Sequence, residues 1–374
     1  MKRKLKIGVL FGGRSAEHEV SLVSATSVIN ALDKKKYDVV PIGITLDGRW
    51  ISSSDTLEVL KSRKKINQQP QKILLPDPNL QGIVEIFSKI NSKENIDVVL
   101  PVLHGTFGED GTVQGLLELA NIPYVGAGVL ASSVAMDKIV ARRLYKAAGI
   151  PVIPDIWFLW KEFQVNKKYF LSQVASELGF PCFVKPANMG SSVGITKAHN
   201  SSELEGAVVL AANYDRKILV EKAVPNAREI EVSLLGNDNP IVSVPGEIIS
   251  SNEFYDYDAK YVDGKSTSEI PANIPKRIAD KIKEYALRGY KAIDCSGMAR
   301  ADFLVGRDSN KIYLNELNTI PGFTSISMYP KLLEASGIPY PKLLDMLIKV
   351  AIERFEEKSK LKTAYRPKKD WYKN

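Results

Sequence analysis

The sequence predicts an α/β unit with a parallel sheet at the N-terminus, followed by α+β units with antiparallel sheets. Strand-like and helix-like segments alternate up to about Gly126, which is typical of βαβ units. From Arg228 onward, several segments alternate apolar and polar residues as antiparallel strands do. A length of 374 residues is enough for two or three domains, each with its own core.

The N-terminal unit begins with three segments in strand–helix–strand order. Residues 6–13 (KIGVLFGG) and 37–45 (YDVVPIGIT) are strand-like, and residues 19–32 (EVSLVSATSVINAL) have helical spacing. A further buried-type strand, IDVVLPVLHG, ends at His104 and is followed by a loop and a helix. Ligands of parallel sheets bind at the carboxyl ends of the strands, so Gly12–Gly13 and His104 are expected to face one crevice. The polar, Pro-containing stretch 52–79 is predicted to be a surface insertion.

The middle of the chain contains a predicted helix and a glycine-rich loop. In MDKIVARRLYKAAGIPVIP, Asp137 lies near the helix start, and the apolar stripe is predicted at Val140, Leu144 and Ala147 or Ala148. The loop KPANMGSSVGI, which begins at Lys185, follows the strand-like FPCFV. Glycines let backbone N–H groups approach an anion closely, yet the P-loop pattern occurs nowhere in this chain.

Residues 301–318 (ADFLVGRDSNKIYLNELN) are predicted to form a β-hairpin that turns at GRDSN. With an odd number of loop residues, Asp302 and Glu316 share one face, with Arg300 and Asn318 beside them. Two carboxylates and an amide suit Mg²⁺, and the guanidinium could stabilise developing negative charge. The alternative is a surface hairpin with solvated acids and a cross-strand arginine pair.

The remaining candidates each have a plain structural alternative. They are Glu17, His104, Lys138, Lys185, Glu221 and Lys222. A first-turn acid, a turn-capping histidine, solvated lysines and an exposed strand edge would account for them without function. Residues 319–330 (TIPGFTSISMYP) either line a carboxylate or oxyanion site with Ser327 or cap a helix that begins near Met328. Residues 255–272, with three tyrosines, form either a mobile cover or a surface linker.

Charge and cysteine usage limit the classes of function. The net charge is +8, of which +6 lies in residues 358–374 and +4 in residues 1–6, so the rest of the chain carries about −2. The basicity therefore belongs to the chain ends, and no nucleic-acid-binding face is expected. No run of about 18 apolar residues is present, so no membrane-spanning helix is expected. Cys182 and Cys295 are too few for a disulfide framework, which favours a reduced, cytoplasmic protein with structural thiols.

Eight segments, in this order, resemble the D-alanine–D-alanine ligase family of the ATP-grasp ligases. They are GGRSAEHEVSL, LHGTFGEDGTVQG, MDK, VKPANMGSSVGI, EKAVPNAREIEV, FYDYDAKY, MARADFLV and NELNTIPGFTSISMYP. The resemblance implies an ATP-grasp fold with an N-terminal substrate-binding domain (1–126), a central subdomain with the glycine-rich loop (127–224), a C-terminal catalytic domain (225–357) and a basic tail (358–374). In that fold the glycine-rich loop closes over ATP held between two antiparallel sheets.

The resemblance also implies roles for individual residues. ATP would contact Lys138, Lys185, Ser192, Glu221, Lys222, Val224 and Glu229, and Lys260 would reach its γ-phosphate. Two Mg²⁺ or Mn²⁺ ions would be held by Asp302, Glu316 and Asn318. Arg300 and the backbone N–H of Gly322 would stabilise the tetrahedral oxyanion. The two D-alanines would lie against Glu17, His104, Ser327 and Met328. Glu17, Ser191 and Tyr261 would form a hydrogen-bonded triad.

The implied activity is ATP-dependent ligation of two D-alanines through a D-alanyl phosphate, for peptidoglycan precursors. The resemblance also implies a homodimer, and neither a nucleic acid nor a membrane is expected as partner. Relatives that make D-alanyl-D-lactate lack the lid tyrosine, whereas Tyr261 is present here. One alternative is ligation of D-alanine to D-lactate or another D-amino acid. Another is an ATP-binding regulatory or nucleic-acid-associated protein, suggested by the basic tail. Asp302, Glu316 and Asn318 argue against the latter, because a binding module needs no phosphoryl-transfer clamp.

Overall fold

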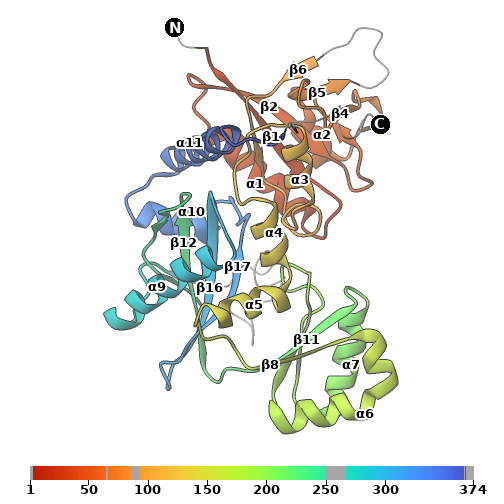
Figure 1. Cartoon of the computed structure of the whole chain (residues 1–374), viewed down its shortest axis with the longest axis vertical. Helices are drawn as coiled ribbons and strands as arrows, with labels where there is room; N and C mark the ends of the chain where they lie inside the picture. The colour runs from red at the N-terminus through yellow and green to blue at the C-terminus, as the bar shows by residue number, and fades with distance from the viewer. Residues whose placement is uncertain (1–2, 65, 86–92, 250–266, 366, 368–374) are drawn as a thin grey trace.

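A computed structural model describes residues 3–64, 66–85, 93–249, 267–365 and 367. Its strands form four sheets, three of which follow one another down the long axis of the molecule (Figure 1). The N-terminal sheet lies at one end, a sheet whose strands lie between residues 227 and 318 is in the middle, and a sheet whose strands lie between residues 155 and 222 is at the other end. No described helix is both long enough and apolar enough to cross a bilayer.

The N-terminal sheet has the strand order β3-β2-β1-β7. Its strands are β1 (Leu5–Gly12), β2 (Tyr37–Ile44), β3 (Trp50–Ile51) and β7 (Val98–Pro101). β1 pairs in parallel with β2 and β7, as the βαβ pattern predicts, while the short β3 runs antiparallel to β2. The sheet is therefore mixed, and the expectation of a wholly parallel sheet is corrected at this edge.

Helices from both ends of the chain cover this sheet. They are α1 (His18–Ala31), α3 (Thr112–Leu119) and α11 (Tyr340–Ser359). Leu343, Leu344 and Leu347 of α11 share a core with Ile7 and Val9 of β1. α11 thus packs on the N-terminal sheet, although the helix and the sheet are far apart in the sequence. The predicted domain boundaries stay a prediction.

The predicted insertion at 52–79 is more ordered than its composition indicates. It contains α2 (Thr56–Ser62), a 3-10 turn η1 (Ile66–Gln68) and β4 (Lys72–Leu74), which pairs with β5 (Gly82–Glu85) next to β6 (Lys93–Asn95). Val59, Leu60 and Leu74 are buried. A few apolar side chains therefore anchor a segment whose polar majority predicted a surface loop.

The central sheet is antiparallel throughout and has the order β10-β9-β11-β8. Its strands are β8 (Asp155–Leu159), β9 (Cys182–Pro186), β10 (Thr196–Ala198) and β11 (Lys217–Lys222). α6 (Trp160–Glu177) and α7 (Ser201–Ala212) pack on it. The glycine-rich loop joins β9 to β10, so it leaves the sheet at the end where Lys185 lies.

α4 (Val129–Met136) and α5 (Lys138–Ala147) lead into the central sheet. Asp137 caps α5, since its carboxylate accepts hydrogen bonds from the N–H groups of Ile139 and Val140. The predicted stripe on α5 is wrong in part. Val140 is 37% exposed and Leu144 is half-buried, whereas the fully buried positions of α5 are Ile139, Ala141, Arg142 and Tyr145.

The third sheet has the order β15-β14-β12-β16-β17, with β13 paired to β12. Its strands are β12 (Ala227–Leu235), β13 (Ile241–Val242), β14 (Gly246–Ile249), β15 (Thr267–Glu269), β16 (Met298–Gly306) and β17 (Ile312–Asn318). The paired strands are antiparallel. α9 (Lys276–Ala292) and α10 (Met328–Ala335) complete this part of the chain. The predicted class, an α/β unit followed by antiparallel α+β units, is confirmed.

Candidate active site

Two adjoining cavities gather most of the predicted site residues. Those that line the first cavity are Glu17, His104, Lys138, Ser191, Arg300, Glu316, Asn318, Gly322, Ser327 and Met328. Those that line the second are Lys138, Lys185, Ser191, Ser192, Glu221, Glu229, Arg300, Asp302 and Glu316. Because Lys138, Ser191, Arg300 and Glu316 line both, the two cavities share a charged wall.

Two predicted residues lie outside this arrangement. Lys222 and Val224 line a separate hollow together with Ile153 and Pro154. Lys260 and Tyr261 fall outside the described residues, so their predicted roles stay a prediction.

Glu17 immediately precedes α1, is 7% exposed and accepts a hydrogen bond from the hydroxyl of Ser191 in the glycine-rich loop. Two glycines make room for this carboxylate. A Cβ on Gly105 would lie 2.7 Å from Glu17 Oε2, and one on Gly190 would lie 2.8 Å from it. The glycine-rich loop can therefore approach Glu17 only because position 190 has no side chain.

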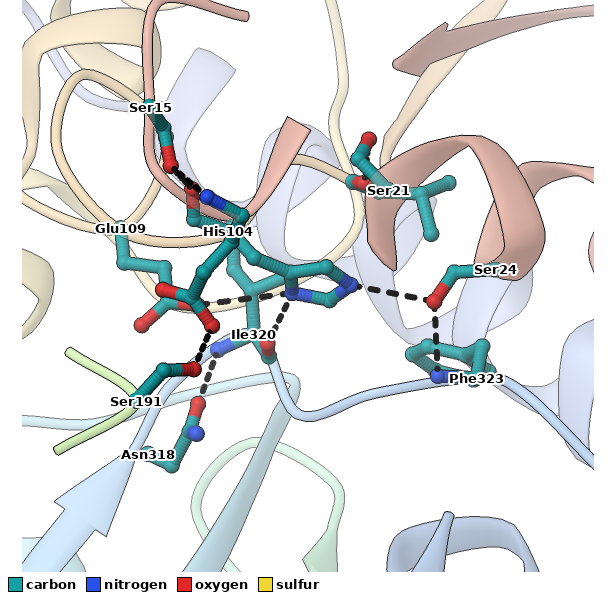
Figure 2. A network of polar contacts seen from close by, with 12 residues as sticks. Ser15, Ser21, Ser24, His104, Glu109, Ser191, Asn318, Ile320 and Phe323 are labelled. Atoms are coloured by element: carbon teal, nitrogen blue, oxygen red, sulfur yellow. Dashed lines mark hydrogen bonds and ion pairs between the residues drawn. The ribbon is translucent and has the colours of Figure 1, made fainter. Parts of the chain in front are cut away.

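His104, just beyond β7, is 4% exposed and is held on both ring nitrogens (Figure 2). Nδ1 lies 3.1 Å from the carbonyl oxygen of Ile320, and Nε2 lies 3.1 Å from the hydroxyl of Ser24 on α1. Burial alone lowers the pKa of His104, but the hydrogen bond and charge of Glu109, whose Oε1 is 3.5 Å from Nδ1, outweigh it and raise the pKa. The imidazole thus joins three segments distant in sequence.

Ser24 also reaches the loop after β17. Its hydroxyl accepts a hydrogen bond from the N–H of Phe323 at 3.4 Å, as Figure 2 shows. Asn318, five residues before Phe323 in the sequence, accepts a hydrogen bond from the N–H of Ile320 through its side-chain oxygen at 3.2 Å. These contacts fix the backbone on both sides of Gly322.

Lys138 ties the glycine-rich loop to the hairpin β16–β17. Its Nζ donates to the carbonyl oxygen of Met189 at 2.7 Å and lies 3.6 Å from Glu316 Oε2. A cation in the first turn of a helix opposes the helix dipole, and here a carboxylate faces it. In this structure the carboxylate of Glu316 therefore provides the negative charge beside Lys138.

The hairpin has the predicted arrangement. Asp302 pairs with Glu316 and Arg300 with Asn318 across β16 and β17, so all four side chains share one face. Arg300 donates to both oxygens of Asp302, at 2.7 and 2.6 Å, and lies 3.1 Å from Glu231. The predicted odd loop is wrong, because Val305 pairs with Ile312 and an even number of residues lies between them. A bulge after Asp302 shifts the register by one residue, and this shift brings Glu316 opposite Asp302.

The hairpin oxygens suit a divalent cation in chemistry. Two carboxylates and an amide provide the hard oxygen ligands that Mg²⁺ prefers. Across the described ranges, no three His, Cys, Asp or Glu side chains converge as a ready-made metal cage. Both carboxylate oxygens of Asp302 accept hydrogen bonds from Arg300, so a cationic side chain contacts the oxygens that are predicted to bind the metal.

Lys185 and Glu221 form a buried ion pair, with Lys185 8% and Glu221 1% exposed. Arg142 of α5, 2% exposed, pairs with the other oxygen of Glu221. Burial is the largest influence on both groups. It lowers the pKa of Lys185, and for Glu221 it is outweighed by the charges of Arg142 and Lys185, so that the pKa of Glu221 is lowered. Glu221 is therefore ionised between two cations.

Ser327 caps α10, which begins at Met328 as predicted. Its hydroxyl accepts from the N–H of Thr324 at 3.0 Å and lies 2.8 Å from the Thr324 hydroxyl. A Cβ on Gly322 would come within 2.6 Å of the Ser327 hydroxyl oxygen. A side chain at position 322 would therefore displace the Ser327 hydroxyl.

Sequence reasoning missed Ser24, Glu109 and Arg142. Glu109 lies five residues after His104 and lines the first cavity, and burial raises its pKa. Its place in the same loop as His104 was an available signal. Ser24 resembles any small helix residue, and Arg142 lies off the predicted apolar stripe, so neither carried a signal in the sequence.

The two antiparallel sheets that enclose a charged cavity, with a glycine-rich loop at its edge, define the ATP-grasp class. Two family models match most of the chain: "D-ala D-ala ligase N-terminus" over residues 6–127 and "D-ala D-ala ligase C-terminus" over residues 144–349. The chain belongs to the D-alanine–D-alanine ligase family, a family of ATP-dependent ligases.

Individual relatives agree with this family. A D-alanine–D-alanine ligase from Caldicellulosiruptor bescii is 52% identical over 96% of this chain and 98% of its own. The solved D-alanine–D-alanine ligase from Coxiella burnetii is 36% identical, with a TM-score of 0.83 over 96% of this chain and 98% of its own. The VanG D-Ala:D-Ser ligase from Enterococcus faecalis is 37% identical, with a TM-score of 0.82 over 93% of this chain and 100% of its own.

Proposed function

We propose that this protein joins two D-alanines into D-alanyl-D-alanine at the expense of ATP, for peptidoglycan precursors. The observation that carries this proposal is the shared wall between the two cavities. A nucleotide in the second cavity would place its terminal phosphate beside Lys138, Arg300 and Glu316, which also border the first cavity. A carboxylate bound in the first cavity would then lie within reach of that phosphate.

ATP would occupy the second cavity with its phosphates toward Lys138, Lys185 and Ser192, and with its ribose toward Glu229. Glu221 would lie on the adenine side. Lys222 and Val224, which line the neighbouring hollow, would flank the adenine only if that hollow and the second cavity form one continuous site with the nucleotide bound.

The first D-alanine would bind in the first cavity. Its ammonium would pair with Glu17, and His104 would lie near its carboxylate. That carboxylate is a poor electrophile, so it would first attack the γ-phosphorus of ATP, with ADP as the leaving group, to give D-alanyl phosphate. Bound Mg²⁺ would neutralise phosphate charge and so permit the attack of one anion on another.

Asp302, Glu316 and Asn318 would hold the metal ions. Arg300 and the N–H of Gly322 would stabilise the oxyanion formed when the second D-alanine, its amino group deprotonated, attacks the carbonyl carbon. The second carboxylate would lie against Ser327 and Met328 at the start of α10. Collapse of the tetrahedral intermediate would expel phosphate and leave the peptide bond.

The acceptor is proposed to be D-alanine, because Tyr261 is present in the sequence. The likeness to a D-Ala:D-Ser ligase makes D-serine a second acceptor to test beside D-lactate. Two buried free thiols agree with a cytoplasmic enzyme, and the family resemblance is the basis for proposing a homodimer, which light scattering would test.

The decisive experiment measures phosphate release from Mg-ATP with D-alanine, L-alanine, and D-alanine mixed with D-lactate or D-serine, with product identification by mass spectrometry. We expect turnover with D-alanine alone, the dipeptide as product, and no mixed product in excess of it. Absence of D-alanine-dependent turnover would overturn the proposal. A dominant D-alanyl-D-lactate or D-alanyl-D-serine product would instead reassign the acceptor.

A further inference from the structure

Arg142 is a buried cation that the proposed chemistry does not use. It is 2% exposed, its neighbours come from three strands in two sheets, and it does not line either cavity. Buried arginines are rare unless they are paired, because removing a guanidinium from water is costly. The contacts of this side chain therefore indicate which role its positive charge has.

The guanidinium of Arg142 joins the two sheets that enclose the second cavity. In the central sheet it pairs with Glu221 on β11 and lies 3.6 Å from Asp155 Oδ2 on β8. In the third sheet it lies 3.4 Å from Asn315 Oδ1 on β17. The planar guanidinium of an arginine has several N–H donors and can contact groups in both sheets, whereas the ammonium of a lysine is a single point charge.

Glu221 is shared between Arg142 and Lys185, with one carboxylate oxygen for each. Lys185 lines the second cavity, so phosphates of a bound nucleotide would compete with Glu221 for its ammonium. If Glu221 had no other cation, the departure of Lys185 would leave a buried carboxylate unpaired, which is strongly unfavourable. Arg142 removes this cost because it stays with Glu221.

We propose that Arg142 is a positioning residue for ATP: it holds Glu221 so that Lys185 is free to exchange that carboxylate for a nucleotide phosphate. The inference rests on the proposed function for its kinetic readout, but nucleotide binding tests it separately. Arg142 touches no substrate in this proposal and acts only through Glu221 and Lys185.

The test compares Arg142→Met and Arg142→Lys with Arg143→Met as a matched control. Arg143 is the next residue of α5 but is exposed, with its guanidinium 4.9 Å from the ring centre of Trp157. The measurements are the KM for ATP, the KM for D-alanine, kcat, and the calorimetric Kd of the non-hydrolysable analogue AMP-PNP in the absence of D-alanine.

We expect Arg142→Met to raise the KM for ATP and the Kd for AMP-PNP about tenfold, with the KM for D-alanine within about twofold of wild type. The KM for ATP and the Kd for AMP-PNP of Arg142→Lys should lie between those of Arg142→Met and of the wild type. Arg143→Met should match the wild type in both values. The double variant Arg142→Met with Glu221→Gln removes one charge of each sign. It should bind AMP-PNP more tightly than Arg142→Met alone, because Lys185 is no longer held by an unshared carboxylate.

A wild-type affinity for AMP-PNP in both Arg142 variants would overturn the inference. An equal rise in the KM for ATP and the KM for D-alanine would also overturn it, because such a rise indicates general loosening of the fold. Should Arg142→Met fail to fold, Arg142→Lys and the charge-balanced double variant carry the test. If the wild type has no D-alanine-dependent turnover, the proposed function fails, while the AMP-PNP measurements still decide the role of Arg142.

Discussion

At the scale of single residues, Glu17 has a position that depends on what is missing around it. Its carboxylate contacts Ser191 and fits between Gly105 and Gly190. All three residues are distant from Glu17 in the sequence. An acid that looks like an ordinary first-turn residue is therefore placed in the wall of the first cavity.

Glu17→Gln tests the proposed role of this carboxylate toward the D-alanine ammonium. Loss of the charge removes a charge-assisted hydrogen bond, so we expect kcat/KM for D-alanine to fall about 100-fold while the KM for ATP changes little. Glu19→Gln is the control, because Glu19 is exposed and pairs with Arg63. Equal activity of Glu17→Gln and wild type would contradict the role.

The two thiols provide a prediction about pH. Burial raises the pKa of Cys182 to about 11 and that of Cys295 to about 12, so both are protonated at pH 8 in the folded protein. We expect a disulfide reagent such as DTNB to label neither thiol at pH 8 until the protein unfolds, and to label both in guanidinium chloride. Rapid labelling of the active enzyme would show that one thiol is accessible.

At the scale of elements, the hairpin β16–β17 could be predicted from the sequence, but its register could not. Val305 pairs with Ile312, so an even number of residues connects the paired strands, and the predicted odd loop is wrong. The bulge after Asp302 shifts the register by one residue and so brings Glu316 opposite Asp302 and Asn318 opposite Arg300. The contact of Arg300 with Glu231 on β12 could not be predicted either, because it depends on which strand lies beside the hairpin.

Glu316→Gln tests the proposed metal site. We expect the Mg²⁺ concentration for half-maximal activity to rise about tenfold and kcat to fall by about 100-fold or more, because an anionic ligand is lost. Asp308→Asn serves as control, since this acid lies in the exposed turn of the same hairpin and bonds Asn226. An unchanged Mg²⁺ dependence in Glu316→Gln would place the metal elsewhere.

The glycine-rich loop allows a second test at this scale. A methyl group at position 190 would collide with the Glu17 carboxylate, so Gly190→Ala should lower activity about tenfold or more by displacing Ser191 from Glu17. At Gly206, in α7, a Cβ meets nothing within 4 Å. Gly206→Ala should keep full activity and stabilise the fold by up to about 1 kcal/mol, measured by urea unfolding. Full activity of Gly190→Ala would mean that the loop need not approach so closely.

At the scale of the whole molecule, the site is assembled from residues between 17 and 328, whereas the positive charge lies at the ends of the chain. α11 ends at Ser359, and Lys358 within it pairs with Glu118 of α3. The chain beyond Leu361 contributes no residue to either cavity among those described.

Removal of residues 362–374 should therefore leave kcat and both KM values within about twofold of the full chain, because the described part of that segment, 362–365 and 367, contributes nothing to the packed core. The same assay that establishes ligation checks this. A collapse of activity would give the basic tail a part in catalysis or assembly.

Local patterns in the sequence determined the fold class and the existence of the hairpin, because period-two and helical spacing act locally, and the resemblance to the family supplied most residues of the two cavities. The local patterns misjudged α5, where the predicted stripe omitted Arg142, and the segment 52–79, where a few buried apolar residues outweigh a polar majority.

Only the tertiary structure decided which distant groups meet. The charge of Arg142 is compensated by Asp155 and Glu221, and the ring of His104 is held by Ser24 and Ile320. These pairings depend on how three sheets pack. A buried charge or ring is stable only where partners from other segments satisfy it, and no local pattern in the sequence records those partners.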